Sequence, residues 1–158
     1  MSSQVFNIAK GRFIELHDRV ANNDPAAGVL VVVVLKAAEV DSALVDRTSL
    51  GAILGAAGNT EADFTNYSRK VLTDADIPPS SVDYTGNFAT ATIPDQDWTP
   101  AGGAVDNTTA KLLICYDPDS GGGTDADILP LVALDWVESA NGSPIIASMS
   151  SDGYGRAT

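Results

Sequence analysis

The chain has 158 residues, of which 44% are hydrophobic and 19% charged, a balance typical of a folded globular domain. Its 9 basic and 21 acidic residues give a formal net charge of -12. This charge repels nucleic-acid phosphates and anionic membrane surfaces, so we expect neither as a partner. The longest apolar run, "VLVVVVL", is far shorter than the roughly 20 residues that span a bilayer.

The first predicted element is an amphipathic helix within residues 5–25, interrupted by Gly11 and ended by "NNDP". Its apolar residues alternate in steps of three and four, as on one face of a helix: Phe6, Ala9, Phe13, Leu16 and Val20. The same N-terminal region lacks the apolar core and cleavage site of a signal peptide, so we expect a soluble protein made in a cytoplasm.

A strand is predicted next, within residues 28–40, because this stretch is β-branched and short. Its apolar residues would lie on both faces, which indicates a central strand covered on each side. A short helix follows within residues 46–59, with Thr48 or Ser49 as its cap and an end near Gly58.

The middle of the chain alternates between strand and turn signals. Residues 61–73 are interpreted as a strand in which Tyr67 and Arg69 share one face, with a helix as the alternative. A proline-bearing turn at residues 74–83 leads into a half-exposed strand at 84–94. Residues 95–107 are expected to form a loop or irregular strand whose Trp98 fills an edge of the core.

Three stronger strand signals occupy the last third: "AKLLICY", "ILPLVALDWV" and "SPIIASM". Glycine-rich turns separate them, and Asn141-Gly142 between two apolar runs is typical of a hairpin. The sum is one α+β domain over residues 1–158, a β-dominated sandwich or barrel with an N-terminal helix and one short second helix.

The loop "YDPDSGGGTDAD" is the most evident candidate metal site. It fails as an EF-hand, because Gly121 takes the fifth position from Asp117 and Ile128 takes the twelfth, where a bidentate glutamate is needed. The alternative is an irregular calcium site made from Asp117, Asp119, Asp125 and Asp127. The structural interpretation is a solvated hairpin turn in which the glycines adopt positive φ.

The sequence predicts no enzyme. His17 is the sole histidine and sits on the expected helix face without an orienting partner or a Gly-x-Ser-x-Gly elbow. Cys115 lies in an apolar run with no histidine or cluster of basic residues nearby in sequence, so we expect a buried, inert thiol. We therefore expect neither a catalytic residue nor a cofactor, calcium being the one ion considered.

Several segments together resemble a family of small structural proteins encoded by tailed bacteriophages and prophages. They are "VFNIAKGRFIELHDRVANNDPA", "VLVVVVLKAA", "FTNYSRKVLTDADI", "IPDQDWTPAGG" and "KLLICYDPDSGGGTDADILPL". The most specific part is the Tyr-x-Arg-x-x-Leu pattern of Tyr67, Arg69 and Leu72, followed by an Asp-x-x-Trp strand and a Tyr-Asp strand.

The resemblance implies a virion component on the head surface, a decoration or cement protein that bridges capsomers and contacts the major capsid protein, itself or both. Analogy favours a homo-oligomer, with a trimer as the expected state. The expected interface residues are Val5, Phe6, Tyr154 and Arg156, with the acidic loop as a projecting surface.

Two alternatives to a head protein stay open. One is a tail, tail-tip or head-to-tail connector component. The other is a surface module for carbohydrate or calcium-dependent binding, in which Trp98 or Trp136 would supply contacts.

Overall fold

The computed structural model describes residues 3–102, 108–150 and 152–157. Six strands form the main antiparallel sheet, in the order β1-β9-β8-β2-β3, with β4 also paired to β2. These strands are β1 (Ser3–Val5), β2 (Val29–Ala37), β3 (Thr60–Glu61), β4 (Lys70–Leu72), β8 (Lys111–Asp117) and β9 (Leu129–Asp135).

Two smaller antiparallel sheets complete the fold. One pairs β7 (Gln96–Trp98) with β10 (Ile145–Ala147). The other has the order β11-β6-β5, from β5 (Ser81–Asp83), β6 (Phe88–Ala91) and β11 (Gly155–Ala157). The predicted α+β, β-dominated class is confirmed, and of the two architectures considered, the closed barrel is not the one that the described strands form.

The centre of the main sheet is β2, which is buried on both faces from Val29 to Leu35. Its antiparallel register with β8 runs without a break from Val29 opposite Asp117 to Leu35 opposite Lys111. Each fully buried Val or Leu contributes roughly 2 kcal/mol of hydrophobic free energy, so this strand supplies much of the core. The predicted central strand is confirmed.

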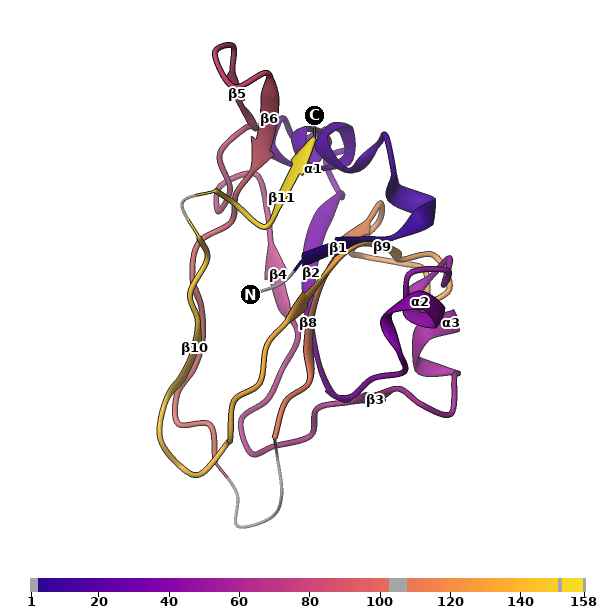
Figure 1. Cartoon of the computed structure of the whole chain (residues 1–158), viewed down its shortest axis with the longest axis vertical. Coiled ribbons are helices and arrows are strands. Elements are labelled where there is room, and N and C mark those ends of the chain that lie inside the picture. Colours follow the sequence, from indigo (N-terminus) through magenta and orange to yellow (C-terminus); the bar gives the residue numbers. More distant parts are fainter. Residues whose placement is uncertain (1–2, 103–107, 151, 158) are drawn as a thin grey trace.

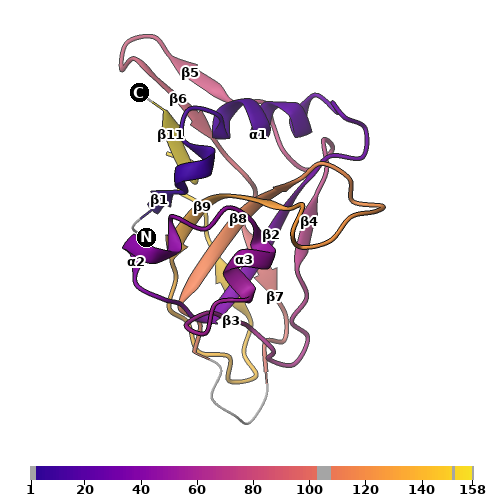
Figure 2. The same cartoon turned by 90° about the vertical axis from the view of Figure 1, so that its right-hand side faces the viewer.

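Separate layers cover the two faces of the main sheet (Figure 1). The short helices α2 (Asp41–Leu44) and α3 (Leu50–Leu54) lie on one face, and the β7–β10 pair lies on the other. The longer helix α1 (Phe13–Ala21) lies at one end, below the β5–β6 hairpin (Figure 2). No helix among the described residues is long and apolar enough to cross a membrane.

The predicted N-terminal helix is correct only from Phe13 onward. Residues 3–9 form β1 and the 3₁₀ turn η1 (Asn7–Ala9), and Gly11, with φ +78, separates them from α1. Phe6 and Ala9 are buried as expected, although no helix carries them. The cause is tertiary: β1 pairs with β9, and Phe6 N–H donates to Leu131 O at 3.0 Å.

The second predicted helix exists as α3, and Ser49 is its cap because its side chain accepts the N–H of Ala52 at 3.1 Å. It ends at Leu54, before the expected Gly58. Residues 61–73 form strand only at their ends, in β3 and β4. The expected loop at residues 95–107 contains β7, and its residues 103–107 lie outside the described residues.

The expected hairpin at Asn141-Gly142 is wrong. Here β10 pairs with β7, with Ile145 opposite Trp98, instead of returning along β9. Aromatic packing accompanies this difference: Trp136, just after β9, packs against Trp98 of β7 with tilted rings whose centroids are 5.6 Å apart. Gly142 N–H then donates to Ala101 O at 2.9 Å. The hairpin between β8 and β9, in contrast, is confirmed.

Among the glycines that the structure describes, Gly153 has the least room for a side chain. It has φ +73, and a Cβ there would lie 2.1 Å from the backbone oxygen of Ala91. We expect Gly153→Ala to lower the free energy of unfolding by roughly 3 kcal/mol, because left-handed strain and a backbone clash add. Gly11→Ala is the control, since Gly11 has φ +78 but open space around it, and should cost about 1 kcal/mol. If the two variants lost equal free energy of unfolding in urea, the proposed backbone clash at Gly153 would be contradicted.

Candidate functional site

In the acidic loop between β8 and β9, aspartate side chains accept hydrogen bonds from the loop's own backbone. Asp117 Oδ1 accepts the N–H of Asp119 at 3.0 Å, and Asp119 Oδ1 accepts that of Gly121 at 3.2 Å. Asp127 Oδ2 accepts the N–H of Thr124 at 2.8 Å. These carboxylates thus stabilise local turns. The loop is a turn, as the sequence interpretation has it, although only Gly123 of its three glycines has a positive φ, +77.

The second half of this loop is anchored to the rest of the fold, which the sequence did not reveal. Arg69 donates to Asp125 through Nη1 at 2.5 Å and Nη2 at 2.9 Å, and the Gly51 N–H of α3 donates to Asp125 O at 2.7 Å. The guanidinium of Arg69 holds the pKa of the Asp125 carboxyl below its ordinary value. Asp125 is therefore engaged in a structural ion pair.

The four aspartates considered for calcium do not converge on a common point. Among the described residues, no group of three or more His, Cys, Asp or Glu side chains is placed to hold a metal ion. Asp117, Asp119 and Asp127 bond to backbone N–H groups, and Asp125 binds a guanidinium. This arrangement favours the turn interpretation of the loop.

The Tyr-x-Arg pattern forms the partner side of that anchor. Arg69 also donates to Glu61, from Nε at 2.8 Å and Nη2 at 2.7 Å. The Tyr67 hydroxyl donates to Glu61 Oε1 at 2.9 Å and accepts the N–H of Val34 at 3.1 Å. Burial of Tyr67 raises its pKa. The pattern thus joins β2, β3 and the acidic loop.

Removing the Arg69 guanidinium should loosen this junction. We expect Arg69→Met to cost about 2 kcal/mol of stability, less than a fully buried pair, because the Arg69 side chain is 28% exposed. Arg69→Lys should recover only part of the loss, since lysine lacks the fork that bonds two carboxylates. Amide exchange at residues 117–127 should accelerate.

The control for this prediction is Arg19→Met. Arg19 makes an exposed pair with Glu15 at 3.0 Å, and its loss should change stability by less than about 0.5 kcal/mol. Equal effects of the two substitutions on urea unfolding would contradict the structural role of Arg69.

His17 is fully buried and holds together three parts of the chain. Its Nε2 lies 2.9 Å from Pro78 O, which can only accept, so Nε2 carries the proton. Its Nδ1 then accepts from the Tyr154 hydroxyl at 3.0 Å. Asp18 beside it accepts the N–H and hydroxyl of Ser80, both at 2.7 Å. These bonds give the histidine a structural role as a neutral ring.

Burial lowers the pKa of His17 below the ordinary value of 6.5, against smaller raising effects from Pro78 and Asp18. The unfolded chain therefore takes up a proton at higher pH than the folded one, and stability should be full above pH 6.5 and fall as the pH drops below it. In His17→Gln, the fall in stability just below pH 6.5 should disappear. The further fall at lower pH, which protonation of the carboxylates causes, should remain. Identical pH profiles in thermal unfolding would contradict this.

Two other side chains that could be reactive, those of Cys115 and Lys111, have structural roles. Cys115 is buried in β8, and burial raises its pKa to about 12, as expected for an inert thiol. Lys111 binds the carboxylates of Asp41 and Asp135. Burial alone would lower the pKa of Lys111, but its bonds to these carboxylates raise it.

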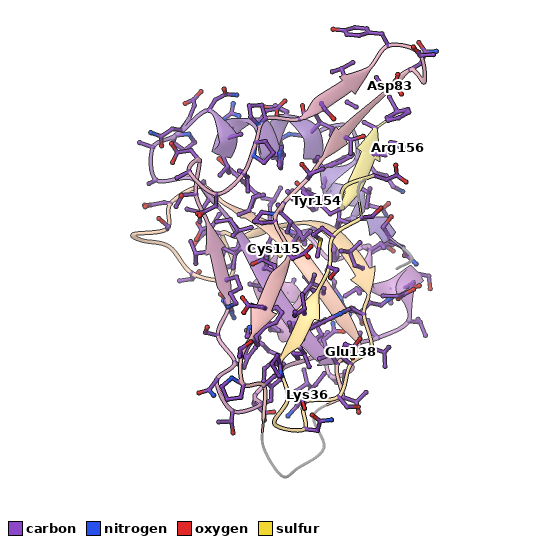
Figure 3. The ribbon with its side chains drawn as sticks, turned by 90° about the vertical axis from the view of Figure 1, so that its left-hand side faces the viewer. Lys36, Asp83, Cys115, Glu138, Tyr154 and Arg156 are labelled. Carbon is purple, nitrogen blue, oxygen red and sulfur yellow. The ribbon has the colours of Figure 1, made fainter. Side chains whose placement is uncertain are left out.

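The four residues expected at an interface have different positions. Phe6 and Tyr154 are core residues, 0% and 1% exposed, so the expectation for these two does not fit their burial. Val5 is half-buried in β1. Arg156 is exposed on β11, where its guanidinium lies 3.7 Å from the ring centre of Phe88 (Figure 3). The C-terminal segment folds back on its own sheet because β11 pairs with β6.

A cleft of about 530 Å³ lies beside this segment. Ser3 and Leu134 of the main sheet line it on one side, and residues of the C-terminal segment, including Tyr154 and Arg156, line it on the other. Its side chains are small or apolar apart from Asp152 and Arg156, which pair at 3.2 Å. No group suited to acid–base chemistry faces another across it among the described residues.

The two tryptophans considered for carbohydrate contacts are buried. Trp98 is 1% exposed and donates its Nε1–H to Ser68 O at 3.0 Å, and Trp136 is 5% exposed. They pack with Phe64 and Tyr67 as an aromatic cluster. Neither ring offers a free face to a sugar, so the prediction that Trp98 fills the core edge is confirmed and the carbohydrate contact is not supported.

The most exposed large apolar side chain described, Tyr84, lies on a hairpin that the sequence interpretation did not single out. The β5–β6 hairpin projects beyond the main sheet (Figure 1), with Tyr84 87% exposed and Val82 53% exposed. Asp83 Oδ1 accepts the N–H groups of Thr85 and Gly86 and closes its turn. The signal was available in "VDYTGNF", where a Gly-Asn turn separates two strand-like runs.

Comparison of the chain with protein-family models, curated proteins and solved structures finds no match. The class that the fold and site define is an antiparallel β-rich protein with two short helices on one sheet face and a projecting hairpin.

Proposed function

We propose that the protein is a structural component of a tailed-bacteriophage virion, most specifically a decoration protein on the head shell. The observation that carries the proposal is the projecting β5–β6 hairpin, whose Tyr84 is the most exposed large apolar side chain described. A tyrosine that is 87% exposed contributes little to the packing of its own fold. Tyrosine is also enriched in protein–protein contacts, because its ring is apolar and its hydroxyl can hydrogen-bond.

The chemistry of the buried polar groups supports binding over catalysis. His17, Arg69 and Lys111 each bond to named partners within the fold, and Cys115 is buried. The proposed mechanism is added contact area across capsomer boundaries, so that expansion of the shell must also break these interfaces. The major capsid protein and further copies of the chain are the proposed partners, and the virion head surface is the proposed location.

Binding to purified head shells that lack tails tests this proposal. We expect the protein to co-sediment with such shells, and Tyr84→Ala to weaken binding at least about tenfold without lowering the melting temperature. Val137→Ala is the matched control, because Val137 is 69% exposed and lies away from the hairpin. It should leave binding unchanged.

The other outcomes discriminate between the candidate functions. Recovery of the protein with tails but not with head shells would replace the decoration role by the tail or connector role. Absence from both fractions, measured by mass spectrometry of virions and tail-less heads, would overturn the structural proposal.

A further inference from the structure

The outer strand of the three-stranded sheet is β5, and all its residues are exposed. Its register with β6 places Ser81 opposite Thr90, Val82 opposite Ala89 and Asp83 opposite Phe88. On its other side no described strand pairs with it. An outer strand presents free backbone N–H and C=O groups unless something covers them.

The hydrogen-bond pattern identifies which β5 residue presents those groups. Ala91 O accepts the N–H of Tyr154 at 3.0 Å, so the backbone groups of Ala91 point toward the β11 side. Backbone groups alternate along a strand, so those of Ala89 point the same way and those of Thr90 and Phe88 point to β5. Val82, opposite Ala89, therefore directs its N–H and C=O to the open edge.

The open edge has a defined beginning. Ser80, two residues before Val82, has its N–H bonded to Asp18 Oδ1 at 2.7 Å, so α1 covers the edge at that point. From Val82 to Tyr84 the edge runs out along the projecting part of the hairpin (Figure 2). The exposed side chains of Val82 and Tyr84 therefore lie on the same edge of the hairpin as the outward-pointing backbone groups of Val82.

We propose that β5 pairs antiparallel with β5 of a second copy, about a two-fold axis at Val82. The two Val82 residues then exchange both backbone hydrogen bonds. Ser81 lies opposite Asp83 of the second copy, so the two Asp83 carboxylates do not face each other. Asp83 uses Oδ1 for the turn, which leaves Oδ2 to accept the Ser81 hydroxyl.

The register is self-complementary within the strand, where each Ser81 lies opposite an Asp83 of the other copy. The paired segment ends before Ser80, where α1 covers the edge and both Asp18 oxygens accept from Ser80. An isologous contact needs this kind of match, since each surface must fit its own copy. A second copy is therefore the occupant that the edge fits.

This contact is small and opposed by charge. Three residues from each strand bury far less than the roughly 800 Å² per partner of a stable complex, so the isolated pair should be weak, with a Kd on the order of 0.1 to 1 mM. Each copy carries a net charge of -12, so added salt should strengthen the pairing by screening repulsion. On a shell that holds many copies, the same contact gains from multivalency.

Analytical ultracentrifugation of the full chain and of Val82→Pro tests the pairing. Proline removes the N–H that points outward and leaves the ladder with β6 intact, as expected for an edge strand. The wild type should associate with rising concentration, more at 0.5 M salt, and Val82→Pro should weaken association at least about tenfold at an unchanged melting temperature. A wild type that stays monomeric up to about 2 mM, where such a Kd would be visible, would overturn the proposal.

Disulfide trapping tests the register independently of the proline variant. In the proposed pair the two residues 82 have Cα atoms about 5.5 Å apart, within disulfide range, whereas the two residues 84 are separated by roughly 13 Å along the strands. Val82→Cys should therefore cross-link rapidly with oxidised glutathione, and the more exposed Tyr84→Cys should not. Buried Cys115 does not compete. Equal rates for the two variants would contradict the register.

The inference rests on the proposed function only in treating the hairpin as a contact surface, and the two can fail separately. Self-association that depends on Val82, together with no binding to head shells, would leave the pairing standing and overturn the virion role. Binding to head shells that depends on Tyr84, together with a monomeric wild type, would leave the virion role standing and overturn the pairing.

Discussion

The unbroken pairing of β2 with β8 is the constraint on which the rest of the structure depends. Because β2 is buried on both faces, other elements must cover each face: α2 and α3 lie on one side, and β7 and β10 on the other. The Arg69 junction with Glu61 and Asp125 then fixes β3 and the acidic loop against this centre. The β5–β6 hairpin and the acidic loop both extend beyond these layers (Figure 2), and the hairpin carries the most exposed large apolar side chain described, so its surface is available for contacts with other molecules.

The elements that the sequence predicts well are those with a strong local signal. The β-branched run of β2, the apolar runs of β8 and β9, and the Ser49 cap are of this kind. The errors have tertiary causes. Residues 3–9 leave the helical pattern because β1 pairs with β9. Asn141-Gly142 does not close a hairpin because β10 pairs with β7, whose Trp98 packs against Trp136. Such partners are distant in sequence, so periodicity and turn signals do not contain them.

The functional side chains were harder to predict than the strands. The spacing of Tyr67 and Arg69 predicts a shared strand face, but the two residues lie outside the strands and meet at Glu61 instead. The bond of Arg69 to Asp125 joins residues 56 positions apart. Phe6 and Tyr154 lie near the ends of the chain, where exposure is common, yet both are buried in the core. The sequence pattern predicts that Tyr84 begins a strand, whereas it is the first residue of the turn after β5 and is therefore exposed. Burial depends on the whole fold, which explains why an exposed aromatic residue and a buried one look alike in sequence.

The molecule consists of an internally bonded centre, formed around the main sheet, and a projecting contact surface on the β5–β6 hairpin. The most direct measurement of this division is residue-resolved amide hydrogen exchange of the protein, free and bound to tail-less head shells. We predict that binding slows exchange in the β5–β6 hairpin and leaves residues 117–127 unchanged, while β2 and β8 exchange slowly in both states. Protection that appears at residues 117–127 or beside the C-terminal cleft, with the hairpin unaffected, would contradict the account.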